Sequence, residues 1–432
     1  MPERPNFVLI HSHDTGRWVE PYGCPVSTPN LQAFAEEGIL FRRAYSAAPN
    51  CSSSRAALLT GRYPHNNGMN GLAHRGWELN DKSQHLINPL RDAGYKTFQI
   101  GEQHITSQPE SMGYDATREF PVNTASKTIP AAIDMLPAAD DPFFMSIGFF
   151  ETHREFPPDP SPTAGLYGPG PPDLPDTPAT RKDMANLQAS ATSLDDGIGK
   201  FLRALDDRGL TDRTVVIITT DHGLPLPRAK GTLYDRGTGV MLLMRFPGTV
   251  PRGTVTDGLV SQLDIYPTIM DLAGLEHPGF LQGSSLIPLI AGVSSSVHDE
   301  VFSEMTFHAA YEPQRAVRTD RWKYIRRFDG RDRPVVVNCD DGPTKDAMLA
   351  AGWADTRLEE EQLFDVVLDP SETRNLANET DHRGELDEMR SRLDAWMERT
   401  DDPIRTGPIE APPGCTFNDP DQTSPHEPST RA

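Results

Sequence analysis

Short apolar runs alternate with longer amphipathic stretches through the first 300 residues of the chain. The apolar runs are at residues 7–10, 97–100, 143–150, 214–220 and 240–245. Each run ends beside a polar or glycine-containing segment, which is typical of buried strands. Helical patterns lie between them, at residues 30–37, 181–210 and 259–275. Strands that alternate with helices predict an α/β fold, in which a mainly parallel central sheet is sandwiched by helices.

The pattern changes near residue 300. Residues 316–328 predict an antiparallel hairpin, and residues 382–399 predict a helix. We therefore predict a large α/β domain over 1–300 and a smaller C-terminal α+β subdomain over 301–400, whose small antiparallel sheet packs on the large domain and closes its pocket. The segment 401–432 is rich in Pro, Asp and Thr, so we expect a disordered or draped tail.

Composition limits the partners of the protein. The 432 residues carry a formal net charge of -21, which disfavours non-specific binding to nucleic acid or to an anionic membrane. An anionic substrate then requires a local positive charge. The four cysteines are scattered without a C-x-x-C pair, so neither a disulfide framework nor a thiolate zinc site is expected. No run is long enough to span a bilayer and the N-terminus lacks a secretory pattern, so we expect a cytoplasmic protein.

Acidic and imidazole side chains follow two of the predicted strands. His13 and Asp14 come after the first apolar run, and Asp221 and His222 come after the run VVIITT. Either pair alone is more often a turn or a helix cap. Because the carboxyl ends of parallel strands meet at one edge of a sheet, the two pairs together predict a site for one divalent metal ion, either Ca, Mn, Fe or Zn.

A cysteine opens a further polar segment. Cys51-Ser52-Ser53-Ser54-Arg55 is followed by the helix-forming run AALLTGR. The sulfur would then lie at a helix N-terminus, where backbone N–H groups favour an anion, with Arg55 one turn further on the same face. The segment by itself favours a plainer interpretation, a buried free cysteine beside serines that cap the helix.

Three more residues on loops after predicted strands carry basic or proton-transferring groups. They are His104, His153 and Lys230. A lone histidine is usually a satisfied hydrogen-bonding group and a lone loop lysine is usually solvated. All three follow different strands of one sheet, however, so they are predicted to face a common crevice.

Several ordered segments resemble one enzyme family. They are PNFVLIHSHD, CSSSRAALLTGRYPHNNGMNGL, IITTDHG and LFDVVLDPSETRNLA. These segments resemble the type I sulfatases of the alkaline phosphatase superfamily, and their order and spacing are most similar to the heparan N-sulfatase (sulfamidase) branch. The resemblance extends over roughly residues 5 to 400. It implies an alkaline phosphatase-like fold.

The resemblance also implies a chemistry for the site. In the family the motif cysteine, here Cys51, is oxidised by a formylglycine-generating enzyme to formylglycine (3-oxoalanine), whose hydrate is the nucleophile. Arg55 matches the arginine that steadies this nucleophile. Asp14, Asp221 and His222 would hold the metal, with His13 as a fourth ligand. His104 would assist breakdown of the covalent sulfate, and His153 and Lys230 would bind sulfate and protonate the leaving atom.

The chain departs from the family pattern at several positions. Ser53 replaces the motif proline that modifying enzymes read. Glu102 replaces a lysine of the sulfate pocket, which implies either a different substrate charge or a substitute cation nearby, such as His74 or Arg75. His13 and His222 replace oxygen ligands with nitrogen, which shifts the preference from Ca toward Mn, Fe or Zn.

The expected activity is hydrolysis of a sulfate ester or sulfamate in a small anionic substrate, such as a sulfated sugar. Two alternatives stay open: a phosphodiester or phosphonate monoester hydrolase built on the same site, and a catalytically silent homologue that binds an anion. Glu304 and His308 lie where the C-terminal region could reach substrate, although a surface position fits them equally well. The sequence gives no indication of an oligomeric state.

Overall fold

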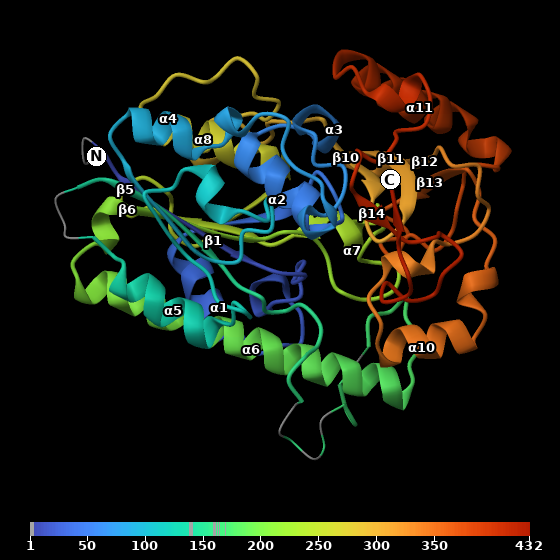
Figure 1. Ribbon diagram of the computed structural model, residues 1–432, viewed down its shortest axis with the longest axis horizontal. Coiled ribbons are helices and arrows are strands. Elements are labelled where there is room, and N and C mark those ends of the chain that lie inside the picture. The colour runs from blue at the N-terminus through green and yellow to red at the C-terminus, as the bar shows by residue number, and fades with distance from the viewer. Residues whose placement is uncertain (1–3, 138–140, 159–160, 162, 164, 169) are drawn as a thin grey trace.

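The computed structural model describes residues 4–137, 141–158, 161, 163, 165–168 and 170–432 (Figure 1). A nine-stranded sheet forms the centre of the larger domain, in the order β4-β3-β5-β1-β6-β8-β2-β7, with β9 paired to β2. Its strands are β1 Asn6–Ser12, β2 Ile39–Tyr45, β3 Lys96–Gly101, β4 Ala116–Arg118, β5 Phe143–Gly148, β6 Thr214–Thr220, β7 Gly239–Val240, β8 Leu242–Arg245 and β9 Thr254–Ser261.

Most neighbouring strands of this sheet are parallel. β1 pairs in parallel with both β5 and β6, and β3 pairs in parallel with β4 and β5. The exceptions involve β7 and β8, which run antiparallel to β2, and β8 also runs antiparallel to β6. The prediction of a mainly parallel α/β sheet is confirmed.

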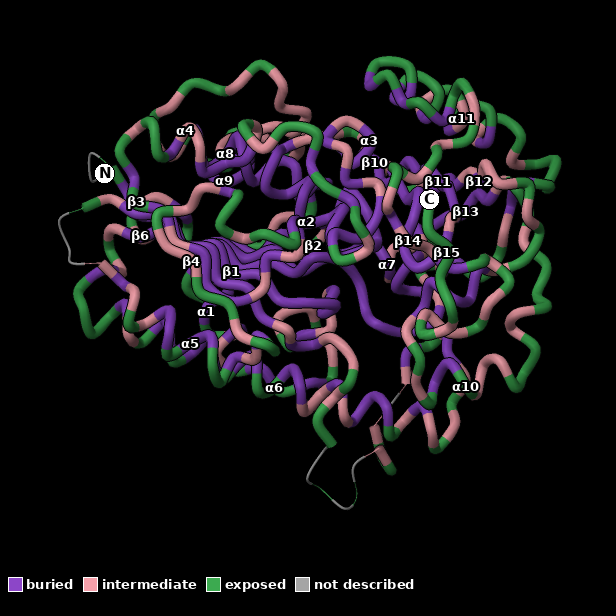
Figure 2. Tube along the Cα trace, in the orientation of Figure 1, coloured by how far each residue is buried: buried purple, intermediate pink, exposed green. Residues whose placement is uncertain are grey.

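Helices cover both faces of the sheet because successive side chains of a strand point to opposite faces. In β1, Val8 and Ile10 join one hydrophobic cluster, while Phe7 and Leu9 join another. The first cluster is completed by α1 Pro29–Glu37, α5 Ala125–Asp134 and α6 Pro178–Asp207. The second is completed by α2 Cys51–Thr60, α4 Ile87–Asp92 and α8 Ile265–Ala273. Figure 1 shows these two helical layers, and Figure 2 shows the buried strands between them.

Shorter helices lie in the connections between these elements. They are α3 Pro64–Asn67, α7 Asp235–Thr238, α9 Ile287–Ile290 and, in the C-terminal region, α10 Pro343–Ala350.

Two sequence predictions were wrong in detail. The helix expected over 259–275 begins as strand, because β9 continues to Ser261 and pairs in parallel with β2, and α8 covers only 265–273. β2 itself was not predicted, since its sequence ILFRRAY contains two arginines. In the structure the Arg43 guanidinium forms an ion pair with Asp320, at 3.0 Å. The strand therefore does not bury an unpaired charge at this position.

The C-terminal region contains a four-stranded antiparallel sheet. Its strands are β10 Glu300–Phe307, β11 Tyr311–Thr319, β12 Trp322–Arg327 and β13 Glu361–Asp365. Helix α11, Arg383–Arg399, packs on this sheet through an apolar face. Trp396 of this helix stacks on Phe302 of β10 with ring centroids 4.9 Å apart. Tyr63 and Ala47 of the larger domain belong to the same cluster, so the two cores are continuous.

Residues 401–432 run back over both regions. Asp402 forms an ion pair with Arg315 of β11, at 2.5 Å. Further along, Asn418 accepts a hydrogen bond from Arg75, at 2.7 Å, and a short two-stranded sheet joins β14 Thr416–Phe417 to β15 Thr430–Arg431. Among the residues that the structure describes, no helix is long and apolar enough to cross a membrane.

Candidate active site

The ends of β1 and β6 bring the two predicted ligand pairs together. The strands are parallel neighbours in a register that places Ser12 opposite Thr220. The next residues of each strand therefore lie side by side, and the backbone N–H of Asp14 donates a 2.8 Å hydrogen bond to the carboxylate of Asp221. Strand order and register thus place all four predicted ligands at one sheet edge.

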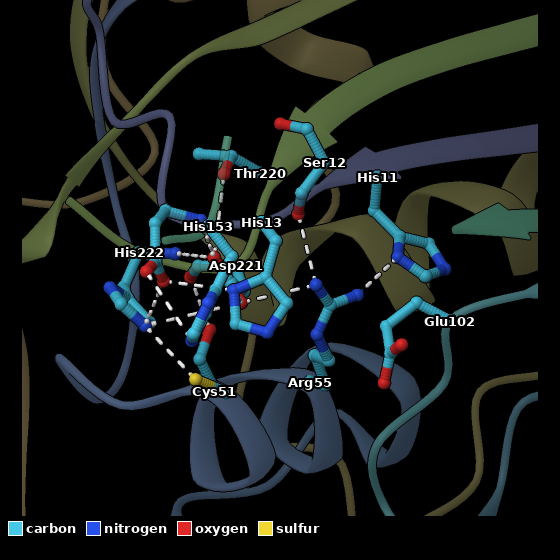
Figure 3. A network of polar contacts seen from close by, with 12 residues as sticks. His11, Ser12, His13, Cys51, Arg55, Glu102, His153, Thr220, Asp221 and His222 are labelled. Atoms are coloured by element: carbon cyan, nitrogen blue, oxygen red, sulfur yellow. Dashed lines mark hydrogen bonds and ion pairs between the residues drawn. The ribbon is translucent and has the colours of Figure 1, made fainter. Parts of the chain in front are cut away.

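The side chains converge on one small volume (Figure 3). His13 Nδ1 lies 2.9 Å from Asp14 Oδ1 and 3.2 Å from Asp221 Oδ2. His222 Nε2 lies 3.0 Å from Asp14 Oδ1 and 3.5 Å from Cys51 Sγ. One ligand atom from each of these five buried residues lies within 4.8 Å of the others. Two oxygens, two nitrogens and a sulfur so arranged fit a divalent cation of the transition series.

The charges of this cluster are strongly coupled. Burial opposes protonation of His222, but Asp221 and Asp14 raise its pKa to about 10. Burial likewise disfavours the Asp14 carboxylate, yet Lys230 and His13 hold its pKa well below the usual range. The lone pairs that hold protons in this cluster are the ones that would bind a metal ion. Metal binding would therefore release those protons.

Cys51 is the first residue of α2 and is buried beside the ligand cluster. Burial raises the pKa of its thiol, but His13 and Lys230 reverse this effect and hold the pKa well below its ordinary value. The serines that follow do not cap the helix. Asn50 precedes the helix without a side-chain cap, while Ser52 Oγ accepts from the Ala73 N–H at 3.0 Å. The helix-capping role of the serines in the plainer interpretation is therefore wrong, whereas Cys51 is buried and free, as that interpretation expected.

Arg55 is fully buried one turn after Cys51. It donates to Ser12 O at 3.0 Å and to Asp221 Oδ2 at 3.1 Å, and its other terminal nitrogen contacts His11 Nδ1. Its Nε has no acceptor among the described residues. The guanidinium thus ties α2 to the end of β1 and keeps one buried donor available.

Lys230 and His153 approach the second carboxylate oxygen of Asp14. Lys230 Nζ donates to Asp14 Oδ2 at 2.8 Å and to Asp340 Oδ2 at 2.7 Å. His153 Nε2 is 4.0 Å from each of these carboxylate oxygens. Asp340 was missed by sequence reasoning, because it lies 110 positions after Lys230 in a loop, NCDD, that has no distinguishing pattern.

His104 lies in the loop after β3, with its ring centroid 6.1 Å from that of His13. Its Nε2 is 2.8 Å from His74 Nδ1, and the rings of His104 and His74 stack with centroids 5.1 Å apart. Burial and the neighbouring His104 lower the pKa of His74 to about 4. His74 is therefore uncharged at neutral pH.

The two groups considered as substitutes for a lysine at position 102 have different surroundings. His74 carries no charge, and Arg75 donates to Asn418 and to the Pro425 carbonyl in the C-terminal segment. Glu102 itself accepts from Asn123 at 2.9 Å. His74 is therefore unsuited to replace the positive charge of the lysine, whereas a role of Arg75 as the substitute cation stays a prediction.

The two C-terminal residues singled out from the sequence have different surroundings. Glu304 is buried and binds His65 at 2.8 Å and Arg315 at 3.2 Å, in a network that joins the two regions away from the ligand cluster. His308 Nδ1 donates to the Asn338 carbonyl at 2.8 Å. His308 also faces Asp340. Burial raises the pKa of the Asp340 carboxyl, but Lys230, His153 and, to a smaller extent, His308 hold that pKa below its ordinary value.

A cavity of about 990 Å³ opens beside His153 rather than over Cys51. Its walls come from α5, α6 and the loop after β5. Phe150 and Phe156 give it apolar surface, and Lys200 and Asp196 give it charge. The cavity and the ligand cluster share His153 as a boundary.

Two family models match the chain. The model described as Sulfatase matches residues 5–275, and the model described as N-sulphoglucosamine sulphohydrolase, C-terminal, matches residues 228–348. Among similar proteins, the N-sulphoglucosamine sulphohydrolase of Homo sapiens is 30% identical over 460 residues, which span 92% of this chain and 91% of that protein. An ulvan-active sulfatase of Formosa agariphila is 28% identical over 92% of this chain and 75% of its own length.

Solved structures show the same fold. A protein described in complex with its substrate D-glucosamine-2-N,6-O-disulfate superposes with a TM-score of 0.74 at 19% identity, over 98% of this chain and 100% of that one. A structure described as a putative sulfatase from Bacteroides thetaiotaomicron gives 0.74 at 23% identity, with the same coverage. With the family model matched over more than half of its length, this chain belongs to the sulfatase family.

Proposed function

We propose that the protein hydrolyses the sulfate ester or sulfamate of a sugar, with a formylglycine formed from Cys51 as the nucleophile. The observation that carries this proposal is the position of the Cys51 sulfur inside the cluster of His13, Asp14, Asp221 and His222. A nucleophile beside a divalent cation is suited to attack on an anionic, tetrahedral centre. The substrate class follows the relatives that act on sulfated sugars.

The metal would be held by Asp14, Asp221 and His222, with His13 as the fourth ligand. When bound, it would polarise the sulfate oxygens and lower the pKa of the nucleophilic hydroxyl. Because two of these ligands are imidazoles, the set favours Mn, Fe or Zn over Ca, which prefers oxygen ligands alone. The hydrated aldehyde at position 51 would supply one hydroxyl for attack and a second to release sulfate.

The other residues would orient the substrate and move protons. Arg55 holds α2 against Asp221 and keeps its Nε available as a donor. His104 would take the proton that breakdown of the covalent sulfate requires. Lys230 and His153, at the second oxygen of Asp14, would bind the sulfate oxygens and give a proton to the leaving oxygen or nitrogen.

Mass spectrometry of the peptide that contains Cys51 tests the proposal directly. The protein is made with and without a formylglycine-generating enzyme, and the expected product has a mass lower by the difference between CH2SH and CHO. Complete retention of the thiol in the co-expressed protein, together with no hydrolase activity, would refute the proposal and favour a silent anion-binding homologue.

A substrate panel tests the alternative chemistry. The metal-loaded protein is assayed with a sugar sulfate ester, a sugar sulfamate, a phosphodiester and a phosphonate monoester. The expected result is that one of the two sulfated compounds has the highest kcat/KM. A higher kcat/KM for the phosphodiester or phosphonate would replace the proposed function with the phospho-substrate alternative.

A further inference from the structure

Lys230 is bound by two carboxylates from different regions of the protein. Its ammonium is buried between Asp14 Oδ2, at 2.8 Å, and Asp340 Oδ2, at 2.7 Å. Asp14 follows β1 in the larger domain, whereas Asp340 lies between β12 and β13 in the C-terminal region. If Asp14 coordinates a metal ion, its charge is shared with that ion, and Asp340 becomes the principal anionic partner of Lys230.

The segment that leads into Asp340 is held by several hydrogen bonds. Asn338 donates through Nδ2 to Glu312 at 2.9 Å and accepts from the Ala310 N–H at 2.8 Å. Directly before Asp340, the Cys339 carbonyl accepts a hydrogen bond from Lys345 at 2.7 Å. The Asp340 carboxylate therefore keeps its position without depending on Lys230 alone.

Asp340 is partly exposed beside His153, which lines the large cavity. Its side chain is 18% exposed and that of His153 is 25% exposed, whereas Asp14 and Lys230 are completely buried. The Asp340 carboxylate lies 4.0 Å from His153 Nε2, so it is close to both groups that would protonate a leaving atom.

We propose that Asp340 is a positioning residue for Lys230 and, at the same time, the acceptor that favours an amine as the leaving group. This inference rests on the proposed function, and it narrows the substrate class to sugar sulfamates. When the S–N bond breaks, the electron pair stays on nitrogen while sulfur bonds to the nucleophilic oxygen. One proton from His153 or Lys230 gives the amine, and a second from water gives the ammonium.

The charge of the released amine is the reason why Asp340 would favour a sulfamate over a sulfate ester. An ammonium group beside a carboxylate gains a charge-assisted hydrogen bond, whereas the hydroxyl released from a sulfate ester stays neutral and gains a weaker one. Removing the charge of Asp340 should therefore weaken sulfamate hydrolysis more than ester hydrolysis. A residue that only maintained the fold would lower both activities by the same factor.

The test compares Asp340→Asn with Asp341→Asn in the metal-loaded, oxidised enzyme. Asp341 is the matched control, because it carries the same charge one position further on but binds Lys345, and asparagine keeps an oxygen that can accept from this lysine. The substrates are glucosamine N-sulfate and glucose 2-sulfate, which differ in the leaving atom.

The two variants should behave differently. D340N should lose about 100-fold in kcat/KM for the sulfamate and about tenfold for the ester, because the amide cannot replace the lost charge. D341N should stay within about twofold of the wild type for both substrates. Equal losses on the two substrates in D340N, or equal behaviour of the two variants, would overturn the inference.

Binding of the product gives a second measurement that does not depend on turnover. Calorimetry of the wild-type protein should show tighter binding of glucosamine than of glucose, which carries a hydroxyl in place of the ammonium group. This preference should disappear in D340N and persist in D341N. Equal affinity of the wild type for the two sugars would contradict the role of Asp340. Absence of turnover with both sulfated sugars would count against the proposed function, while this binding comparison still decides the inference.

Discussion

Arg55 and Asp221 form a buried ion pair, at 3.1 Å, that joins α2, which begins at Cys51, to the end of β6, where two of the proposed metal ligands lie. Arg55 also binds the carbonyl of Ser12, so one guanidinium fixes α2 relative to both β1 and β6. This contact helps to set the distance between position 51 and the ligand cluster. The geometry of the site therefore depends on Arg55. The family resemblance gave this residue only the role of steadying the nucleophile.

Replacing Arg55 with alanine should reduce both stability and activity. The change leaves the Asp221 carboxylate without its buried partner, which costs roughly 3–5 kcal/mol. Chemical denaturation and kcat/KM measure the two effects. Arg42→Ala, at an exposed position of β2, is the control and should change the unfolding free energy little. Wild-type stability in R55A would contradict the structural role.

Replacing Asp221 with asparagine should remove metal from the protein. The carboxylate contributes charge and an oxygen ligand, so metal affinity should fall by more than about tenfold. Metal analysis after dialysis measures the content, and activity should fall with it. Asp212→Asn, on an exposed turn before β6, is the matched control. Full metal content in D221N would show that the ligand set is assigned incorrectly.

Restoring the motif proline by Ser53→Pro should increase the fraction of Cys51 that is oxidised. The first helical hydrogen bond of α2 runs from Ser54 N to Asn50 O, so the N–H of Ser53 precedes the first intrahelical donor and its loss costs little. Mass spectrometry after co-expression with a formylglycine-generating enzyme gives the fraction. An unchanged fraction in S53P would mean that Ser53 does not limit maturation.

Acidification should destabilise the protein through His85. Burial lowers the pKa of this fully buried histidine to about 3, so the folded state binds fewer protons than the unfolded state between pH 3 and the usual value near 6.5. The contribution to stability is thus complete above that usual value and is lost as the pH falls, by about 2 kcal/mol at pH 5. Denaturation of wild type and His85→Asn across this range measures the loss. An equal pH dependence in the variant would contradict the assignment.

The sequence determined the elements that carry strong patterns. The apolar run of β6 and the amphipathic pattern of α6 are local, so their positions follow from neighbouring residues alone. The pairs His13-Asp14 and Asp221-His222 were recognisable because each follows a strand, and the motif around Cys51 was recognisable by its resemblance to a family. β2 was not, because of its two arginines: Arg42 is exposed to solvent and Arg43 pairs with Asp320, which is distant in the chain.

Only the tertiary structure decided which of these residues meet. The parallel register of β1 and β6 brings together ligands that are 207 positions apart, and the C-terminal region adds Asp340 to Lys230 across 110 positions. No local pattern encodes such contacts, since they depend on strand order and on the packing of one region against another. The sequence thus determined the chemistry available to this protein, and the fold determined where that chemistry is assembled.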